Sequence, residues 1–162
     1  MNARSRLPIT SRAEFLDALR TAFGQAADAG AREIWLCDPT FADWPLSEPA
    51  VIENLTRWVD SQRRLTLLAH SFDEVGRRHA RWSQWRRQWS HAVQCRSNSE
   101  LEEAEYPTLC LVPGVVSVYL ADPVRHRGIS STEAADGLAC RERIDAVSQR
   151  SGETFPVTQL GL

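Results

Sequence analysis

The 162-residue chain contains no lysine: arginine supplies all nineteen of its basic residues. This absence excludes Schiff-base chemistry and any reaction that needs a lysine as general base. Acidic residues slightly outnumber the arginines, and the formal net charge is −2. The molecule as a whole therefore does not attract polyanions, so any affinity for an anion has to come from a local cluster of arginines.

Sequence motifs of common enzyme and metal sites are also missing. The chain has no G-x-G-x-x-G, no P-loop, no H-E-x-x-H and no G-x-S-x-G elbow. None of its four cysteines (Cys37, Cys95, Cys110 and Cys140) belongs to a C-x-x-C pair, which excludes a zinc knuckle and a thioredoxin-like site. We therefore expect neither a metal ion nor a cofactor.

No apolar run approaches the ~20 residues that a membrane-spanning helix needs. Residues 1–8 include two arginines, but no apolar stretch follows them, so the sequence predicts no secretory signal peptide. Three of the cysteines lie in apolar segments, where a free thiol behaves as a small buried hydrophobe. These features predict a cytoplasmic protein without a membrane partner, folded as one domain over residues 1–162, with residues 1–10 flexible.

The pattern of apolar residues predicts helices that alternate with short, continuous apolar strands. The first helix begins at Ser11, which forms a capping-box pattern with Glu14, and ends at Gly30. Pro113 and Gly114 separate two later apolar runs, as in an antiparallel hairpin. The expected strands are 33–37, 65–69, 92–95, 109–112 and 115–120. The expected helices are 11–29, 48–61, 72–89 and 133–149. We also expect a Gly/Ser-rich loop over 127–132 and an apolar tail from the last helix to residue 162.

Short connections between the first three strands favour a parallel sheet with right-handed crossovers. The sequence thus predicts an α/β fold with a mixed sheet of about five strands, three parallel plus a C-terminal hairpin, flanked by helices.

Ligands of such sheets bind beyond the carboxyl ends of the strands. The residues that follow the predicted strands include acids, imidazoles and guanidiniums, a combination that suits an anion such as a phosphoryl group. The alternative explanation is that loops of any α/β protein are polar because they face water. These residues are Asp38 and Thr40 after the first strand, His70, Ser71 and Asp73 after the second, and Arg96, Ser97 and Asn98 after the third. If the second hairpin strand runs parallel to the first three, Asp122, Arg125, His126 and Arg127 join them.

The densest cluster of charge and aromatic rings lies in residues 75–99, which contain six arginines, two histidines, three tryptophans and no acidic residue. At about 100° per residue, His79, Trp82 and Arg86 lie on one side of a helix, and Trp85 lies at the margin of that side. This phasing predicts an aromatic ridge packed on the sheet. The alternative is a docking surface for a phosphate backbone or an acidic partner, with the other arginines facing outward and Trp85 as a partly exposed platform.

The order of strands and helices resembles one half of a phospholipase-D-like domain. From residue 32 to the end, the chain is also similar to a group of uncharacterised proteobacterial proteins. The segments that carry this similarity are DWPL (43–46), RLTLLA (64–69), HARWSQWRR (79–87), WSH (89–91), DP (122–123) and FPVTQLGL (155–162).

The resemblance implies a degenerate phospholipase-D-like fold. Catalysis in that superfamily uses the motif H-x-K-x-x-x-x-D, in which histidine is the nucleophile and lysine holds the phosphate, and a complete site contains two such motifs. The chain departs from this pattern because it has no lysine and residues 115–120 contain no histidine, although Asp122 resembles the acid of the motif. The resemblance therefore implies a domain without phosphodiesterase activity.

The leading hypothesis is a non-catalytic domain that binds a phosphate-containing ligand or a partner protein, in which arginines hold the anion and histidines make binding depend on pH. A second hypothesis is a phosphoesterase in which His70 or His126 acts with Asp73 or Asp122. A third is an interaction module that forms homo-oligomers through Trp85 or the apolar tail. Nucleic acid is a less favoured partner because the chain is acidic overall. The candidate ligand-binding residues are His70, His79, Arg81, Arg86, His91, Arg96, Asp122 and Arg125.

Overall fold

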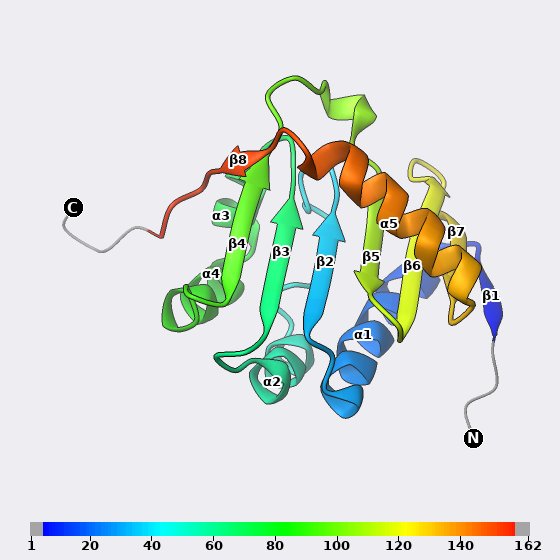
Figure 1. The fold of residues 1–162 in the computed structure, drawn as a ribbon, viewed down its shortest axis with the longest axis horizontal. Coiled ribbons are helices and arrows are strands. Elements are labelled where there is room, and N and C mark those ends of the chain that lie inside the picture. The colour runs from blue at the N-terminus through cyan, green and yellow to red at the C-terminus, as the bar shows by residue number, and fades with distance from the viewer. Residues whose placement is uncertain (1–4, 158–162) are drawn as a thin grey trace.

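A computed structural model describes residues 5–157 of the chain. Within these residues one mixed sheet contains eight strands, in the order β1-β7-β6-β5-β2-β3-β4-β8 (Figure 1). The strands are β1 (Arg6–Ile9), β2 (Glu33–Cys37), β3 (Arg64–Leu68), β4 (Val93–Ser97), β5 (Thr108–Val112), β6 (Val116–Asp122), β7 (Arg127–Ser131) and β8 (Gly152–Glu153), and the helices are α1 (Arg12–Ala29), α2 (Pro49–Trp58), α3 (Asp73–Arg78), α4 (Ala80–Gln88) and α5 (Ala134–Ser148), with a 3-10 turn at Glu103–Glu105.

The centre of the sheet is parallel, as the sequence predicts. β3 lies between β2 and β4 and runs parallel to both, and its side chains from Leu65 to Leu68 are all buried. Such continuous burial is typical of a strand covered on both faces. β5 runs antiparallel to β2, and β6 runs antiparallel to β5, which confirms the predicted hairpin. β6 therefore points in the same direction as β2, β3 and β4, and these four strands end at one edge of the sheet.

Helices cover the two faces of the sheet unequally (Figure 1). The helices α1 to α4 lie on one face, and α5 crosses the other. The larger core lies under the four helices and includes the completely buried side chains of Phe23, Trp58 and Trp82. The smaller core lies under α5 and includes Leu109 and Ile144. Because full burial of one large apolar side chain stabilises a fold by about 1.5–3 kcal/mol, the four-helix face supplies most of the hydrophobic stabilisation.

The sheet has eight strands within residues 5–157 rather than about five. The three additional strands form where we expected a flexible start (β1), a Gly/Ser-rich loop (β7) and an apolar tail (β8). β7 pairs with β1 on one side and with β6 on the other. Its glycine and serines have little strand preference of their own, and they form a strand because both neighbouring strands pair with them. The remainder of the predicted tail, from residue 158 to residue 162, lies outside the described residues.

The helix expected over 72–89 is divided into α3 and α4. The division falls at His79, whose φ of −118° and ψ of 53° lie outside the helical region. The other helices follow the expected ranges, and α1 begins at Ser11 and ends at Gly30 as predicted, with Gly30 in the left-handed conformation. None of the helices in the described part of the chain has the length and apolar character needed to cross a bilayer.

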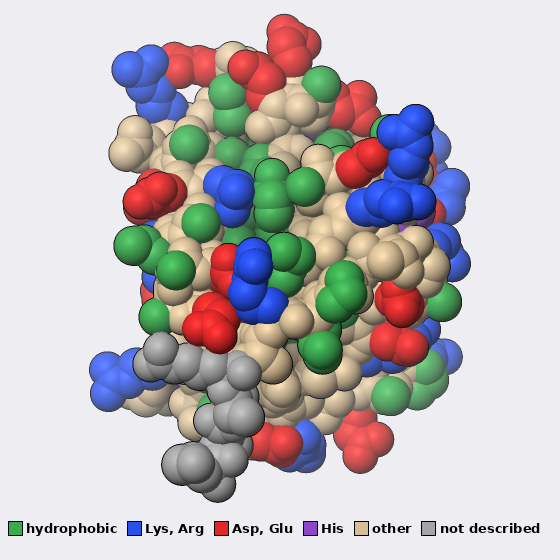
Figure 2. Space-filling view, turned by 90° about the vertical axis from the view of Figure 1, so that its right-hand side faces the viewer, with side chains coloured by type: hydrophobic (Ala, Val, Ile, Leu, Met, Phe, Trp, Pro, Cys, Tyr) green, Lys and Arg blue, Asp and Glu red, His purple; other side chains and the backbone are tan. Residues whose placement is uncertain are grey.

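Basic and acidic side chains are interspersed on the end of the molecule that β1 and β7 form (Figure 2). One ion pair there joins Arg6 of β1 to Asp136 of α5 at 2.8 Å. The Ser131 hydroxyl, and to a smaller extent Arg6, hold the pKa of Asp136 below its ordinary value. The stabilisation from this carboxylate is therefore lost only when the pH falls through that lowered pKa. These contacts tie β1, β7 and α5 together.

Gly128→Ala is expected to lower the free energy of unfolding by about 1–3 kcal/mol. An added Cβ would lie 1.9 Å from the carbonyl oxygen of Tyr119 and would force β6 and β7 apart. Gly137→Ala is the matched control, because its added Cβ meets no atom within 4 Å and alanine favours a helix by about 0.5–1 kcal/mol over glycine. Urea denaturation measures both effects, and equal stability of the two variants would contradict the close approach of β6 and β7.

Candidate anion-binding site

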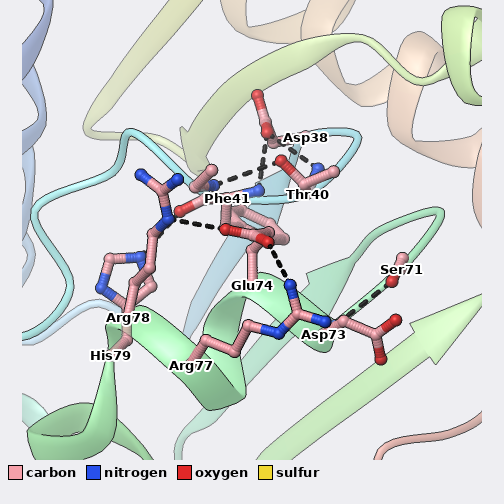
Figure 3. A network of polar contacts seen from close by, with 10 residues as sticks. Asp38, Thr40, Phe41, Ser71, Asp73, Glu74, Arg77, Arg78 and His79 are labelled. Carbon is pink, nitrogen blue, oxygen red and sulfur yellow. Dashed lines mark hydrogen bonds and ion pairs between the residues drawn. The ribbon is translucent and has the colours of Figure 1, made fainter.

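Asp38, which directly follows β2, fixes the conformation of the loop after that strand. The Oδ2 atom of Asp38 accepts hydrogen bonds from the backbone N–H groups of Thr40 (3.0 Å) and Phe41 (2.7 Å), as Figure 3 shows. The Oδ1 atom accepts a third from the Thr108 hydroxyl at 2.6 Å. Both oxygens of this carboxylate therefore have donors from the protein, and Asp38 serves to fold the loop back on the sheet.

His79 holds the same loop from the helix side. Phe41 is completely buried and has a φ of 59°, a conformation that costs energy for a residue with a large side chain. The Nε2 atom of His79 lies 2.8 Å from the carbonyl oxygen of Phe41 (Figure 3). A carbonyl only accepts, so this nitrogen carries the proton and donates. His79 is 5% exposed, and this contact gives it a structural role at the junction of α3 and α4.

The other predicted residues at this edge of the sheet each contact a neighbour of their own. His70 is exposed and lies edge-on to the ring of Tyr106, with ring centres 5.9 Å apart. Arg96 donates from Nε to the Ser151 hydroxyl (2.8 Å) and from Nη2 to the Ser151 carbonyl (2.7 Å), and so fastens the chain after α5 to β4. A role for these residues in ligand binding stays a prediction.

Asp122 and Arg125 form an ion pair of 3.1 Å in the turn between β6 and β7. Hydrogen bonds from Arg125 hold the pKa of the Asp122 carboxyl below its ordinary value. The two charges compensate each other, so neither is presented alone to a ligand.

No histidine–carboxylate pair supports the phosphoesterase hypothesis. All four histidines belong to residues 5–157, and none of the ion pairs formed within that range includes one of them. The same range holds no group of three or more His, Cys, Asp or Glu side chains placed to bind a metal ion.

Arg86 differs from the other predicted residues because its charge is buried without an acidic partner. The side chain is 6% exposed, and no ion pair between residues 5–157 includes it. Its Nε atom is buried and has no hydrogen-bond acceptor within the described structure. The guanidinium carbon lies 5.0 Å from the ring centre of Phe155. A ring face attracts a cation but does not replace a counter-charge, so the site favours the arrival of an anion.

The thiol beside Arg86 does not supply that counter-charge. Cys95 is buried, and burial raises the pKa of its thiol to about 12, although Arg86 acts in the opposite direction. The thiol therefore stays neutral at physiological pH, and within residues 5–157 no negative charge pairs with Arg86.

Two cavities adjoin Arg86. We call residues 154–157, which end the described chain, the C-terminal strap. The strap is joined to β4 by a hydrogen bond from the N–H of Thr154 to the carbonyl of Cys95, and its Phe155 ring stacks on Phe72 at 5.5 Å. Arg86, Pro156 and Val157 line both cavities, so the guanidinium and the strap lie between them. We call the two cavities together the Arg86 site.

The smaller cavity, of about 370 Å³, has basic and hydroxyl donors, and none of the described residues that line it is acidic. Ser83 and Arg87 line it with Arg86, because residues three and four apart share one side of α4. The Ser83 hydroxyl oxygen is buried and has no hydrogen-bond partner among the described residues. Arg87 is exposed. Two of the side chains that line this cavity thus contain a buried polar atom without a hydrogen-bond partner among the described residues, and Arg87 adds a third donor.

The larger cavity, of about 600 Å³, has a different lining. Besides Arg86 it includes the polar side chains of Ser90, His91, Gln94 and Glu153. Gln94 Nε2 donates to Glu153 Oε1 at 3.3 Å across the junction of β4 and β8. His91 therefore joins Arg86 as a predicted ligand residue that lies in this site.

Sequence reasoning missed several parts of the Arg86 site and misplaced one residue. Ser83 stands in the same cluster as Arg86, but only the structure shows that its hydroxyl is unsatisfied. Phe155 comes from the far end of the chain, and no local pattern connects it with α4. Trp85 is 5% exposed and donates from Nε1 to the Thr56 hydroxyl at 3.1 Å, so the alternative of a partly exposed platform is wrong, and Trp82 and Trp85 pack inward as the aromatic ridge predicts. Arg81 is exposed, as the helical phasing predicts, and reaches the Ser47 carbonyl at 3.3 Å.

Asp122 is the residue that resembles the acid of the phospholipase-D-like motif. In H-x-K-x-x-x-x-D, histidine and lysine stand seven and five residues before the acid. If Asp122 is that acid, the two positions hold Val115, which directly precedes β6, and Ser117, the second residue of β6. Neither side chain supplies a nucleophilic imidazole or an ammonium group.

No family model matches the chain, and no curated protein matches it. Among solved structures, the fold is similar to that of TrmBL2, an archaeal chromatin protein that shows a novel mode of DNA binding, with a TM-score of 0.62 and 11% identity over 94% of this chain and 54% of that chain. It is also similar to NucT from Helicobacter pylori, with a TM-score of 0.58 and 6% identity over 94% of this chain and 100% of that chain. The chain thus spans about half the length of TrmBL2. At these identities the similarity shows the α/β fold alone.

His79→Ala is expected to lower the free energy of unfolding by about 1–3 kcal/mol, because it leaves the buried Phe41 carbonyl without its donor. His91→Ala removes an exposed imidazole and should change stability by less than about 0.5 kcal/mol. Thermal and urea denaturation of the two variants provide the comparison. A loss no larger for His79→Ala than for His91→Ala would contradict the structural role of His79.

Proposed function

We propose that the protein is a non-catalytic phospholipase-D-like domain that binds a phosphate-containing anion at the Arg86 site. The order of strands and helices supports the class, and the fold aligns with that of NucT from Helicobacter pylori over the whole length of that chain. One observation carries the binding proposal: Arg86 is 6% exposed and has no acidic partner within the described structure. A buried charge without a partner of opposite charge lowers the stability of the fold by several kcal/mol, and a bound anion offsets this desolvation penalty.

Phosphate fits the donors of the smaller cavity better than a neutral ligand does. The guanidinium of Arg86 offers a planar set of N–H donors, and its Nε–H is unsatisfied. The Ser83 hydroxyl and the Arg87 guanidinium add donors from the same side of α4. A phosphate oxygen accepts charge-assisted hydrogen bonds from each of these groups, and such bonds are roughly twice as strong as neutral ones.

The absence of catalysis rests on the motif positions. Val115 and Ser117 stand where histidine and lysine would be needed, and no lysine exists elsewhere in the chain to replace the missing one. The protein is therefore proposed to hold a phosphate group without cleaving it.

Arg86→Met is expected to abolish the binding of inorganic phosphate and pyrophosphate in isothermal titration calorimetry. The substitution removes the charge and keeps a long apolar side chain beside Phe155. Arg64→Met is the matched control: it removes the same charge from an exposed position at the start of β3 and should leave binding unchanged. Without ligand, Arg86→Met should also raise the free energy of unfolding, by about 1 kcal/mol or more, because it removes an uncompensated buried charge.

Two results would overturn this proposal. Equal phosphate binding by Arg86→Met and the parent protein would place the anion elsewhere. A marked loss of stability in Arg86→Met, with no phosphate binding by the parent, would show that Arg86 serves only the packing of α4 and the strap.

Nucleic acid is a second candidate ligand, favoured by exposed arginines beside the Arg86 site. Arg77, Arg78, Arg81 and Arg87 are exposed on α3 and α4, and Glu74 is the acid that pairs with the first two. TrmBL2, whose fold is similar, is an archaeal chromatin protein that binds DNA, which supports this candidate at the level of the fold. Such a surface would contact the phosphate backbone without reading sequence.

Arg81→Gln tests this second candidate through the salt dependence of oligonucleotide binding. If Arg81 contacts one phosphate, the substitution should reduce the slope of log K against log salt by about 0.9, measured by fluorescence anisotropy. Arg64→Gln should leave the slope unchanged. An unchanged slope in Arg81→Gln, or no oligonucleotide binding at low salt, would exclude this surface as the contact.

A further inference from the structure

We propose that the ligand of the Arg86 site is a hydroxylated organic phosphate, such as a sugar phosphate, which places its phosphate in the smaller cavity and its hydroxyl groups in the larger one. This inference rests on the proposed phosphate site and adds the class of molecule to it. Its basis is the contrast between the two cavities that meet at Arg86.

The two cavities differ in the formal charge of their lining: the smaller is basic, and in the larger, one arginine is balanced by one carboxylate. The smaller cavity is lined by Arg86 and Arg87 and by no acid. The larger cavity shares Arg86 but also contains the carboxylate of Glu153. A second phosphate group in the larger cavity would meet that carboxylate, and like charges at close range repel. The larger cavity therefore suits an uncharged, polar part of the ligand.

The side chains of the larger cavity match hydroxyl groups. Glu153 offers two acceptor oxygens, and the amide of Gln94 offers both donors and an acceptor. Ser90 and Thr154 each add a hydroxyl that donates and accepts. The hydrogen bond from Gln94 to Glu153 is long, at 3.3 Å, and lies on the exposed surface. A ligand hydroxyl that donates to Glu153 and accepts from Gln94 can replace it.

The same lining disfavours a nucleobase. A base is held mainly by stacking on aromatic rings, and the larger cavity has no Phe, Tyr or Trp in its lining. Phe155 lines the smaller cavity instead, where it faces Arg86. The two cavities, of about 600 and 370 Å³, each have the volume of a small-molecule site. The site is therefore built for a compact polar metabolite with one anionic end.

Competitive calorimetry with defined probes tests this inference. The probes are inorganic phosphate, glucose 6-phosphate, ribose 5-phosphate, sn-glycerol 3-phosphate, free glucose and adenosine 5′-monophosphate. At least one of the three hydroxylated phosphates should bind about tenfold more tightly than inorganic phosphate, because two or more hydrogen bonds are added. Free glucose should not bind measurably, because it lacks the anion.

Variants of the larger cavity separate the two parts of the site. Gln94→Ala and Glu153→Gln should remove the advantage of the hydroxylated phosphate and leave the affinity for inorganic phosphate the same or slightly higher. Ser83→Ala should weaken both ligands equally, because the smaller cavity holds the phosphate of each. Glu142→Gln, which neutralises an exposed acid on α5, is the control and should change neither.

The outcomes distinguish this inference from the proposed function. If inorganic phosphate binds through Arg86 but no hydroxylated phosphate binds more tightly, the inference is wrong and the phosphate site stands. If adenosine 5′-monophosphate binds most tightly, the larger cavity accepts a base, and the inference is likewise wrong. If inorganic phosphate and the organic phosphates all fail to bind, both the inference and the proposed function fall.

Discussion

The burial of Trp82 determines where Arg86 lies. Trp82 is completely buried between α4 and the sheet, and Arg86 follows it by four residues. In a helix, residues four apart lie on the same side, so the packing that buries the indole also carries the guanidinium into the interior. Trp85 donates a hydrogen bond to Thr56, and this contact opposes a rotation of α4 that would expose Arg86 to solvent. Of the three arginines of α4, Arg86 is thus held inside by the packing of its aromatic neighbours, whereas Arg81 and Arg87 are exposed.

The strap completes the surroundings of this arginine without neutralising it. Phe155 stacks between Phe72 and the guanidinium, in rings that lie almost parallel, with 6° between the planes of Phe72 and Phe155. Phe155 itself has a φ of 48°, so the chain adopts an unfavourable backbone conformation to reach this position. Such conformations persist where the surrounding contacts fix them, and they are common at ligand sites. Among the described residues, the Arg86 guanidinium therefore contacts an aromatic ring rather than a carboxylate. Its positive charge is left available to bind an anion.

Local patterns predicted the parts of the molecule that local physics controls. The continuous apolar runs of β2 and β3 and the Pro-Gly hairpin were recognisable because burial on both faces and a tight turn leave marks in the sequence. The short strand β7 was not, because Gly128 and the serines around it form a strand only between two paired neighbours. In the site, helical phase placed Arg86 correctly, since the 3.6-residue period is a local property. The contribution of Phe155 depends on the tertiary fold, and the break at His79 depends on a contact with Phe41, so neither was predictable from α4 alone.

A crystal structure of the protein grown with phosphate tests the central claim most directly. We expect an anion in the smaller cavity, within hydrogen-bond distance of the Arg86 guanidinium and the Ser83 hydroxyl, with Phe155 of the strap still stacked on Phe72. An empty smaller cavity at a phosphate concentration that saturates the protein in solution would contradict it. So would a phosphate bound instead at the edge of the sheet where β2, β3, β4 and β6 end.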